Sequence, residues 1–145
     1  MCGTGRWGMR DFEIIEHTAD AGIIAYGAGL EEAFANAARA MFSLMADLGS
    51  VREEVCCDIQ AEAPDREGLL VAWLSELLYV FEVEGTLFSR FEITHLDDTT
   101  IKAKAYGEPL DAGRHSLTSG IKAVTYHMLK IEESDGCRVQ VIFDA

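Results

Sequence analysis

The segment GLLVAWLSELLYVFEV, residues 68 to 83, constrains the fold more than any other part of the sequence. It is long enough for about four turns of helix, and its apolar residues surround most of the helix instead of forming one stripe. Such a helix lies deep in a core or beneath a partner subunit. We expect core packing, with Trp73 and Tyr79 against a sheet. Asp65 is the predicted N-cap.

A second helix is predicted from Leu30 to Asp47, where apolar residues recur at intervals of three and four and describe one buried stripe. Gly29 precedes this helix, and Gly49 marks its expected end. Glu31 and Glu32 suit its positive N-terminal end. The stripe consists of Leu30, Phe34, Ala37, Met41, Leu44, Met45 and Leu48.

Short segments rich in β-branched and aromatic residues predict strands. A hairpin is expected around Asp97-Asp98, and another around Ser134-Asp135-Gly136, although Ile121, Val124 and Met128 also fit a helix face. The predicted strands are FEIIE (12–16), GIIAY (22–26), VCCDIQAE (55–62), LFSRFEITHL (87–96), TIKAKAYGE (100–108), IKAVTYHMLKIEE (121–133) and CRVQVIFDA (137–145).

The order of these elements predicts a single α+β domain at residues 11–145, with two main helices packed on an antiparallel or mixed β-sheet. Residues 1–10 are expected to be a loose N-terminal leader. A chain of 145 residues is about one domain long and can bury a core without disulfide bonds.

Twelve Lys and Arg against 25 Asp and Glu give a net charge of −13, which repels phosphate backbones and favours a basic partner surface or a cation. Direct, non-specific nucleic-acid binding is therefore disfavoured. No apolar run is long enough to cross a membrane. The four cysteines show no CxxC spacing, and we expect reduced thiols in a cytoplasmic protein.

The sequence contains no GxSxG elbow, no zinc spacing such as HExxH and no phosphate-binding glycine fingerprint. These absences disfavour nucleophilic, zinc-dependent and nucleotide-binding enzymes. The remaining candidate functional groups are oxygen ligands, which suit hard cations such as calcium and magnesium. The candidates are Asp20 in HTAD, Asp144, and the terminal carboxylate of Ala145. From local sequence, Asp20 can equally be a turn-forming acid and Asp144 a solvated tail acid.

A long polar stretch from Tyr106, YGEPLDAGRHSLTSGIKAV, interrupts the apolar pattern. Functional residues are often found on such loops, but the simpler interpretation is a solvated loop with local ion pairs. Its polar residues include Glu108, Arg114, His115 and Lys122. His17 is interpreted as a structural hydrogen-bonding group, because no proton-transfer partner can be assigned to it.

Several unusual segments occur together from about residue 12 to residue 145 and resemble the archease family. They are HTAD with GIIAYG, LEEAFANAARAMFSLMAD, WLSELLYVFE, YGEPLD, and RH with IKAVTYH and the terminal VIFDA. The resemblance implies a protein cofactor of a GTP-dependent RtcB-type tRNA-splicing ligase. Such a cofactor promotes guanylylation of the ligase histidine, restores turnover, broadens nucleotide use and meets RNA only through the ligase.

The resemblance also implies a divalent metal, most often calcium, with magnesium and manganese as alternatives, held by Asp20, Asp144 and Ala145. It places Asp47 and Lys122 near the partner or its phosphates. Many relatives end in Val or Ile, so packing by the last side chain is reduced here, whereas the terminal oxygens are unaffected. The oligomeric state stays open.

An alternative interpretation is a chaperone or modulator of an RNA-modifying enzyme, such as a tRNA methyltransferase, acting through the acidic surface without a metal. An independent hydrolase is less favoured, because no activated nucleophile or acid–base pair can be assigned.

Overall fold

The computed structural model describes residues 11–16, 21–111, 113–115 and 121–144. Within these residues the chain forms an α+β fold of two α-helices and eight strands, and every strand pairing is antiparallel. The predicted fold class is confirmed, but the strands form two sheets instead of one. The predicted leader at 1–10 lies outside the described residues.

The first sheet has the order β1-β2-β8-β6, and β7 also pairs with β8. Strand β8 lies centrally, with β2 on one side and β6 and β7 on the other. The strands predicted at 12–16 and 22–26 are present, and so is the strand predicted to begin at residue 137. The members are β1 (Phe12–Glu16), β2 (Ala21–Gly27), β6 (Ala123–Val124), β7 (Lys130–Glu132) and β8 (Cys137–Asp144).

The second sheet has the order β3-β5-β4 and contains the predicted hairpin around Asp97-Asp98. Its strands are β3 (Val55–Glu62), β4 (Thr86–Leu96) and β5 (Thr100–Pro109). Strands β4 and β5 approach closely at Gly107. A Cβ atom there would lie 1.8 Å from the backbone oxygen of Leu87, so this position requires glycine.

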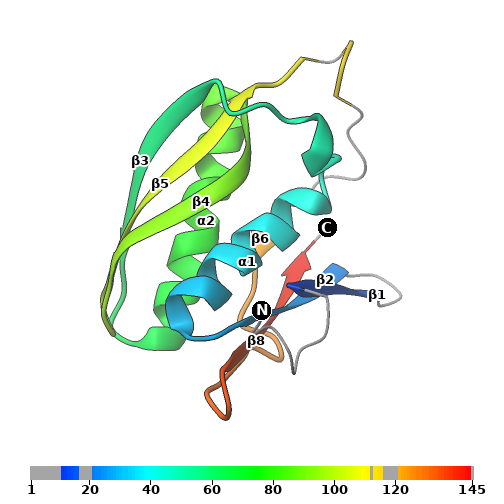
Figure 1. The fold of residues 1–145 in the computed structure, drawn as a ribbon. Helices are drawn as coiled ribbons and strands as arrows, with labels where there is room; N and C mark the ends of the chain where they lie inside the picture. Colours follow the sequence, from blue (N-terminus) through cyan, green and yellow to red (C-terminus); the bar gives the residue numbers. More distant parts are fainter. Residues whose placement is uncertain (1–10, 17–20, 112, 116–120, 145) are drawn as a thin grey trace.

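Helix α1 (Leu30–Ser43) lies between the two sheets and contacts β2 on one side and β4 on the other (Figure 1). Its burial is therefore broader than the single predicted stripe. Small side chains at many of its positions let both sheets approach its backbone. The buried residues are Ala33, Phe34, Asn36, Ala37, Ala38, Ala40, Met41 and Phe42.

The predicted end of this helix at Asp47 is wrong, because the helix stops at Ser43. Asp47 adopts an extended backbone and caps a short 3₁₀ helix, η2 (Leu48–Ser50). Its carboxylate accepts the Gly49 N–H at 3.0 Å. Asp47 therefore begins the next element and does not extend α1.

Helix α2 (Arg66–Glu84) confirms the predicted cap, since the Asp65 carboxylate accepts the Gly68 N–H at 2.7 Å. The helix ends at Gly85, whose φ of 69° lies in the left-handed region. Trp73 is fully buried, and its Nε1 donates to the Phe34 carbonyl of α1 at 3.0 Å. The expectation for Tyr79 is wrong: it is 59% exposed.

The predicted strand at 121–133 is only partly confirmed. It is divided into β6 and β7 by a turn at residues 125–129, and the alternative helix is absent from this described segment. The interruption coincides with a contact to β8 and an unusual backbone conformation. Thr125 turns its hydroxyl toward the Ile142 carbonyl, and Met128 adopts a left-handed φ of 56°.

Cys56, Cys57 and Cys137 are free thiols, whereas Cys2 lies outside the described residues. Burial raises the pKa of Cys137 to about 11, which makes this thiol unreactive. Of the helices in the described residues, none has the length and apolar character that a membrane crossing requires.

We predict that Gly107→Ala destabilises the fold by about 3 kcal/mol, because the added methyl group meets backbone that a side-chain rotation cannot move. Chemical denaturation at neutral pH measures the loss. Gly113→Ala is the control, since its Cβ would make only ordinary contact. Equal stability of the two variants would contradict the close approach of β4 and β5.

Candidate functional site

Asp144 is the last residue of β8 and is exposed. Its backbone carbonyl accepts the Lys122 N–H at 2.7 Å. Its carboxylate makes no hydrogen bond or ion pair with other residues of the described part. This carboxylate is therefore available for a ligand at the surface.

The other two predicted metal ligands, Asp20 and Ala145, lie outside the described residues, as does His17. The register of the flanking strands is nevertheless defined. Ala21, which follows Asp20 in sequence, pairs with Phe143, which precedes Asp144. The two segments expected to carry the ligands therefore meet at one end of the first sheet.

The donor chemistry at this end suits a hard cation, because carboxylate and terminal oxygens are the ligands that calcium and magnesium prefer. Asp144 supplies one such group. Within the described residues, no cluster of three or more His, Cys, Asp or Glu side chains could hold a metal ion. A site here therefore depends on Asp20 and Ala145 as additional ligands.

Lys122 is exposed and immediately precedes β6, which pairs with the end of β8. Its backbone N–H is fixed on Asp144, while no ion pair within the described residues engages its ammonium group. The structure thus brings Lys122 and Asp144 together through their backbones. A free lysine beside a carboxylate can contact a phosphate group.

Asp47 is exposed at the start of η2, where it has the capping role described above. In the described part, no hydrogen bond or ion pair joins it to Lys122 or Asp144. In the view of Figure 1 the C-terminal end of β8 points toward the end of α1 that leads to Asp47.

The polar stretch from Tyr106 contains a buried cluster that the sequence analysis missed. Glu108 is 2% exposed and His115 is 3% exposed, so the expected solvated loop is wrong here, although the ion pairing is present. Glu108 accepts the Arg52 N–H at 2.8 Å, lies 2.9 Å from His115 Nε2, and forms an ion pair with Arg114. We call Glu108, Arg114 and His115 the Glu108 cluster.

The electrostatics of the Glu108 cluster follow from its donors. Burial by itself raises the pKa of Glu108, but the Arg52 N–H, Arg114 and His115 outweigh it and lower that pKa to about 2. His115 Nδ1 accepts the Asp111 N–H at 2.8 Å, so Nε2 carries the proton that is donated to Glu108. The cluster therefore combines a carboxylate with a neutral histidine.

Arg114 extends the cluster to the segment that follows Asp47, since its guanidinium donates to the Ser50 carbonyl at 2.8 Å. The cluster therefore fastens the end of η2 to the end of β5. We interpret its role as structural, because its charged atoms are directed at one another. Its detection from sequence would have required knowing that the distant segment at Arg52 and the turn that carries His115 both cover Glu108.

Comparisons with known proteins agree on one family. The Archease protein family is matched by residues 12–145. The protein archease of Methanosarcina acetivorans is 43% identical over 140 residues, covering 93% of this chain and 96% of that protein. The protein archease of Pyrococcus furiosus is 43% identical over 127 residues, covering 86% and 89%.

A solved structure is also similar. The solution structure of Methanobacterium thermoautotrophicum protein 1598 matches with a TM-score of 0.76 and 43% identity. The match covers 94% of this chain and 100% of that chain. At this level of identity and coverage, the solved structure has the same fold as this chain, which agrees with the family match.

We predict that the Glu108 cluster makes stability sensitive to acid. A carboxyl group whose folded pKa is lowered from 4.5 to about 2 stabilises the fold above pH 4.5, and this contribution is lost as the pH falls toward 2. Glu108→Gln should therefore be less stable at pH 7 and lose less stability across this window. Denaturation followed by circular dichroism from pH 7 to pH 2 measures both effects.

The exposed Glu62→Gln serves as the control and should follow the unsubstituted protein across this pH range. An unchanged acid profile for Glu108→Gln would contradict the assigned hydrogen bonds.

Proposed function

Because this chain belongs to the archease family, we propose that it is a protein cofactor that activates a GTP-dependent RtcB-type RNA ligase. It promotes guanylylation of the ligase histidine and multiple turnover, and it acts in the cytoplasm in tRNA splicing. The observation that carries the proposal is the family match over residues 12–145, which includes Asp20, Lys122 and Asp144.

In this proposal Asp20, Asp144 and Ala145 hold a divalent cation, with calcium favoured over magnesium and manganese. Two observations support it: the pairing of Ala21 with Phe143, and the exposed Asp144 carboxylate with no partner in the described residues. A bound cation would neutralise phosphate charge during nucleotidyl transfer.

Lys122 is assigned to the phosphates or the interface, because its ammonium group is exposed and its backbone is fixed beside Asp144. Asp47 is assigned to the partner surface. The net charge of −13 steers the chain toward the basic, RNA-binding surface of a ligase. RNA is contacted only through the ligase.

The second candidate function is a chaperone or modulator of an RNA-modifying enzyme, such as a tRNA methyltransferase. The acidic surface also supports this function, and so does the exposed apolar side chain of Val83 on α2. It differs from the ligase proposal in requiring no metal.

We predict that Asp20→Ala and Asp144→Ala each lower stimulation of a cognate ligase by at least about tenfold, because loss of a ligand weakens the proposed cation site. Multiple-turnover ligation measures stimulation, and calorimetric titration with Ca²⁺ measures binding. The surface variant Glu62→Ala should leave both values unchanged.

The outcomes separate the candidate functions. If the unsubstituted protein does not increase the turnover of the ligase, the ligase proposal is contradicted. If both aspartate variants stimulate the ligase fully, the ligase remains the partner, but the metal mechanism is contradicted.

A further inference from the structure

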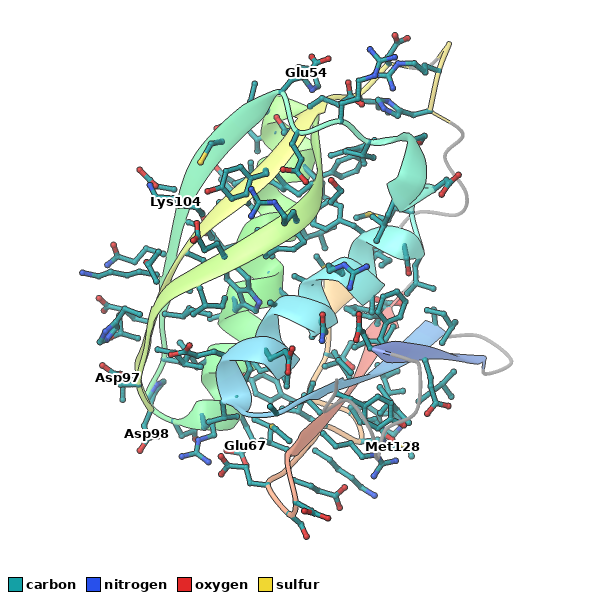
Figure 2. The ribbon with its side chains drawn as sticks, viewed as in Figure 1. Glu54, Glu67, Asp97, Asp98, Lys104 and Met128 are labelled. Atoms are coloured by element: carbon teal, nitrogen blue, oxygen red, sulfur yellow. The ribbon has the colours of Figure 1, made fainter. Side chains whose placement is uncertain are left out.

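The turn at residues 125–129, between β6 and β7, presents large apolar side chains to solvent. Tyr126 is 63% exposed and Met128 is 48% exposed. Met128 is labelled at the lower end of the molecule in Figure 2, where its side chain is at the surface. Aromatic residues and methionine exposed close together are typical of protein-binding surfaces.

Hydrogen bonds hold the beginning of this turn against β8. Thr125 donates its N–H to the Ile142 carbonyl at 3.1 Å and its hydroxyl to the same oxygen at 2.8 Å. The His127 N–H donates to the Thr125 hydroxyl at 3.2 Å. The entry into the turn is therefore fixed by both backbone and side chain.

The second half of the turn is fixed as well. The Leu129 N–H donates to the Tyr126 carbonyl at 3.1 Å. Gln140 of β8, only 9% exposed, donates its Nε2 to the Met128 carbonyl at 2.9 Å. The exposed side chains therefore project from an ordered backbone, which reduces the entropy lost on binding.

Met128 adopts a left-handed backbone with φ of 56°. This conformation is unfavourable for a residue with a Cβ atom, and a methionine has no polar side chain to offset it locally. Glycine would relieve this strain, yet the position carries a large side chain that is half exposed and contributes little to the core. A strained backbone at an exposed residue indicates that the residue has a role other than stabilising the fold.

The turn is continuous with the candidate functional site. It follows β6 directly, and Ala123 and Val124 of β6 pair with Asp144 and Phe143 of β8. Lys122 and the turn therefore belong to one segment that is anchored on β8, the strand that ends in Asp144. Only the two residues of β6 and Thr125 separate Lys122 from Tyr126 in the chain.

The charges near Tyr126 define the kind of partner. A Cβ atom at Gly68 would lie 3.5 Å from the Tyr126 hydroxyl, which places that hydroxyl over the first turn of α2. Asp65 and Glu67 are exposed in this first turn and its cap. Arg66 between them is already ion-paired, and Lys122 and Lys130 flank the turn. The chain as a whole carries −13, so a partner with cationic groups around an apolar pocket is complementary to Asp65 and Glu67.

We propose that the turn at residues 125–129 is a preformed docking element, in which Tyr126 and Met128 enter an apolar pocket with a cationic border on the ligase. The inference rests on the proposed function for the identity of this partner. A second copy of the chain fits less well, because both copies carry −13. RNA fits less well because its phosphates would face Asp65 and Glu67.

The test uses Tyr126→Ala and Met128→Gly in multiple-turnover ligation at increasing concentrations of the variant. Each should raise the concentration for half-maximal stimulation about tenfold, as expected for loss of an interface anchor, while the maximal turnover is retained. Met128→Gly should also keep or raise the Tm, because glycine relieves the strained φ. A loss of binding without a loss of stability separates docking from folding.

Tyr79→Ala is the matched control, since Tyr79 is 59% exposed but lies on α2, and it should stimulate like the unsubstituted protein. Equal half-maximal concentrations for the variants at 126, 128 and 79 would overturn the docking inference. So would self-association or RNA binding that depends on Tyr126, measured by sedimentation and filter binding. Absence of stimulation by the unsubstituted protein would instead overturn the proposed function, and with it the assigned partner.

Discussion

The burial of α1 between the two sheets is the constraint on which the rest of the structure depends (Figure 1). The helix contacts β2 and β4 on different sides, and alanines at 33, 37, 38 and 40 leave room for both sheets. Helix α2 is joined to it by the Trp73 Nε1 hydrogen bond to the Phe34 carbonyl, which satisfies a buried donor. Substituting these small residues would separate the sheets, so the shape of the whole domain follows from this one helix.

This arrangement separates a stabilising region from a surface suited to binding. The Glu108 cluster fastens β5 to the segment after α1 and directs its charges at one another. At the end of β8 the opposite holds, since Asp144 and Lys122 are exposed and their charged groups have no partner in the described residues. Groups that already satisfy one another contribute to stability, whereas unengaged charged groups on an ordered backbone are suited to binding.

Features encoded locally could be predicted from the sequence. The Asp65 cap, the hairpin around Asp97-Asp98 and the strands β1 and β2 each depend on neighbouring residues, and the structure has them. The burial of Glu108 could not be predicted in this way. Alternation along β5 directs Ile101, Ala103 and Ala105 inward and would leave Glu108 outside, but the segments at Arg52 and His115 cover it. The turn at 125–129 likewise depends on Ile142 and Gln140, which are distant in sequence.

For the candidate site, the resemblance supplied the residues, and the fold brings together two of the chain segments that flank them. The β2–β8 register brings the segment after Asp20 to the segment before Asp144, although 123 positions separate Ala21 from Asp144 in the sequence. The most direct measurement is the rate at which a cognate ligase forms its guanylylated histidine with and without this protein. The account predicts a faster rate that requires Asp144, and an unchanged rate would contradict it.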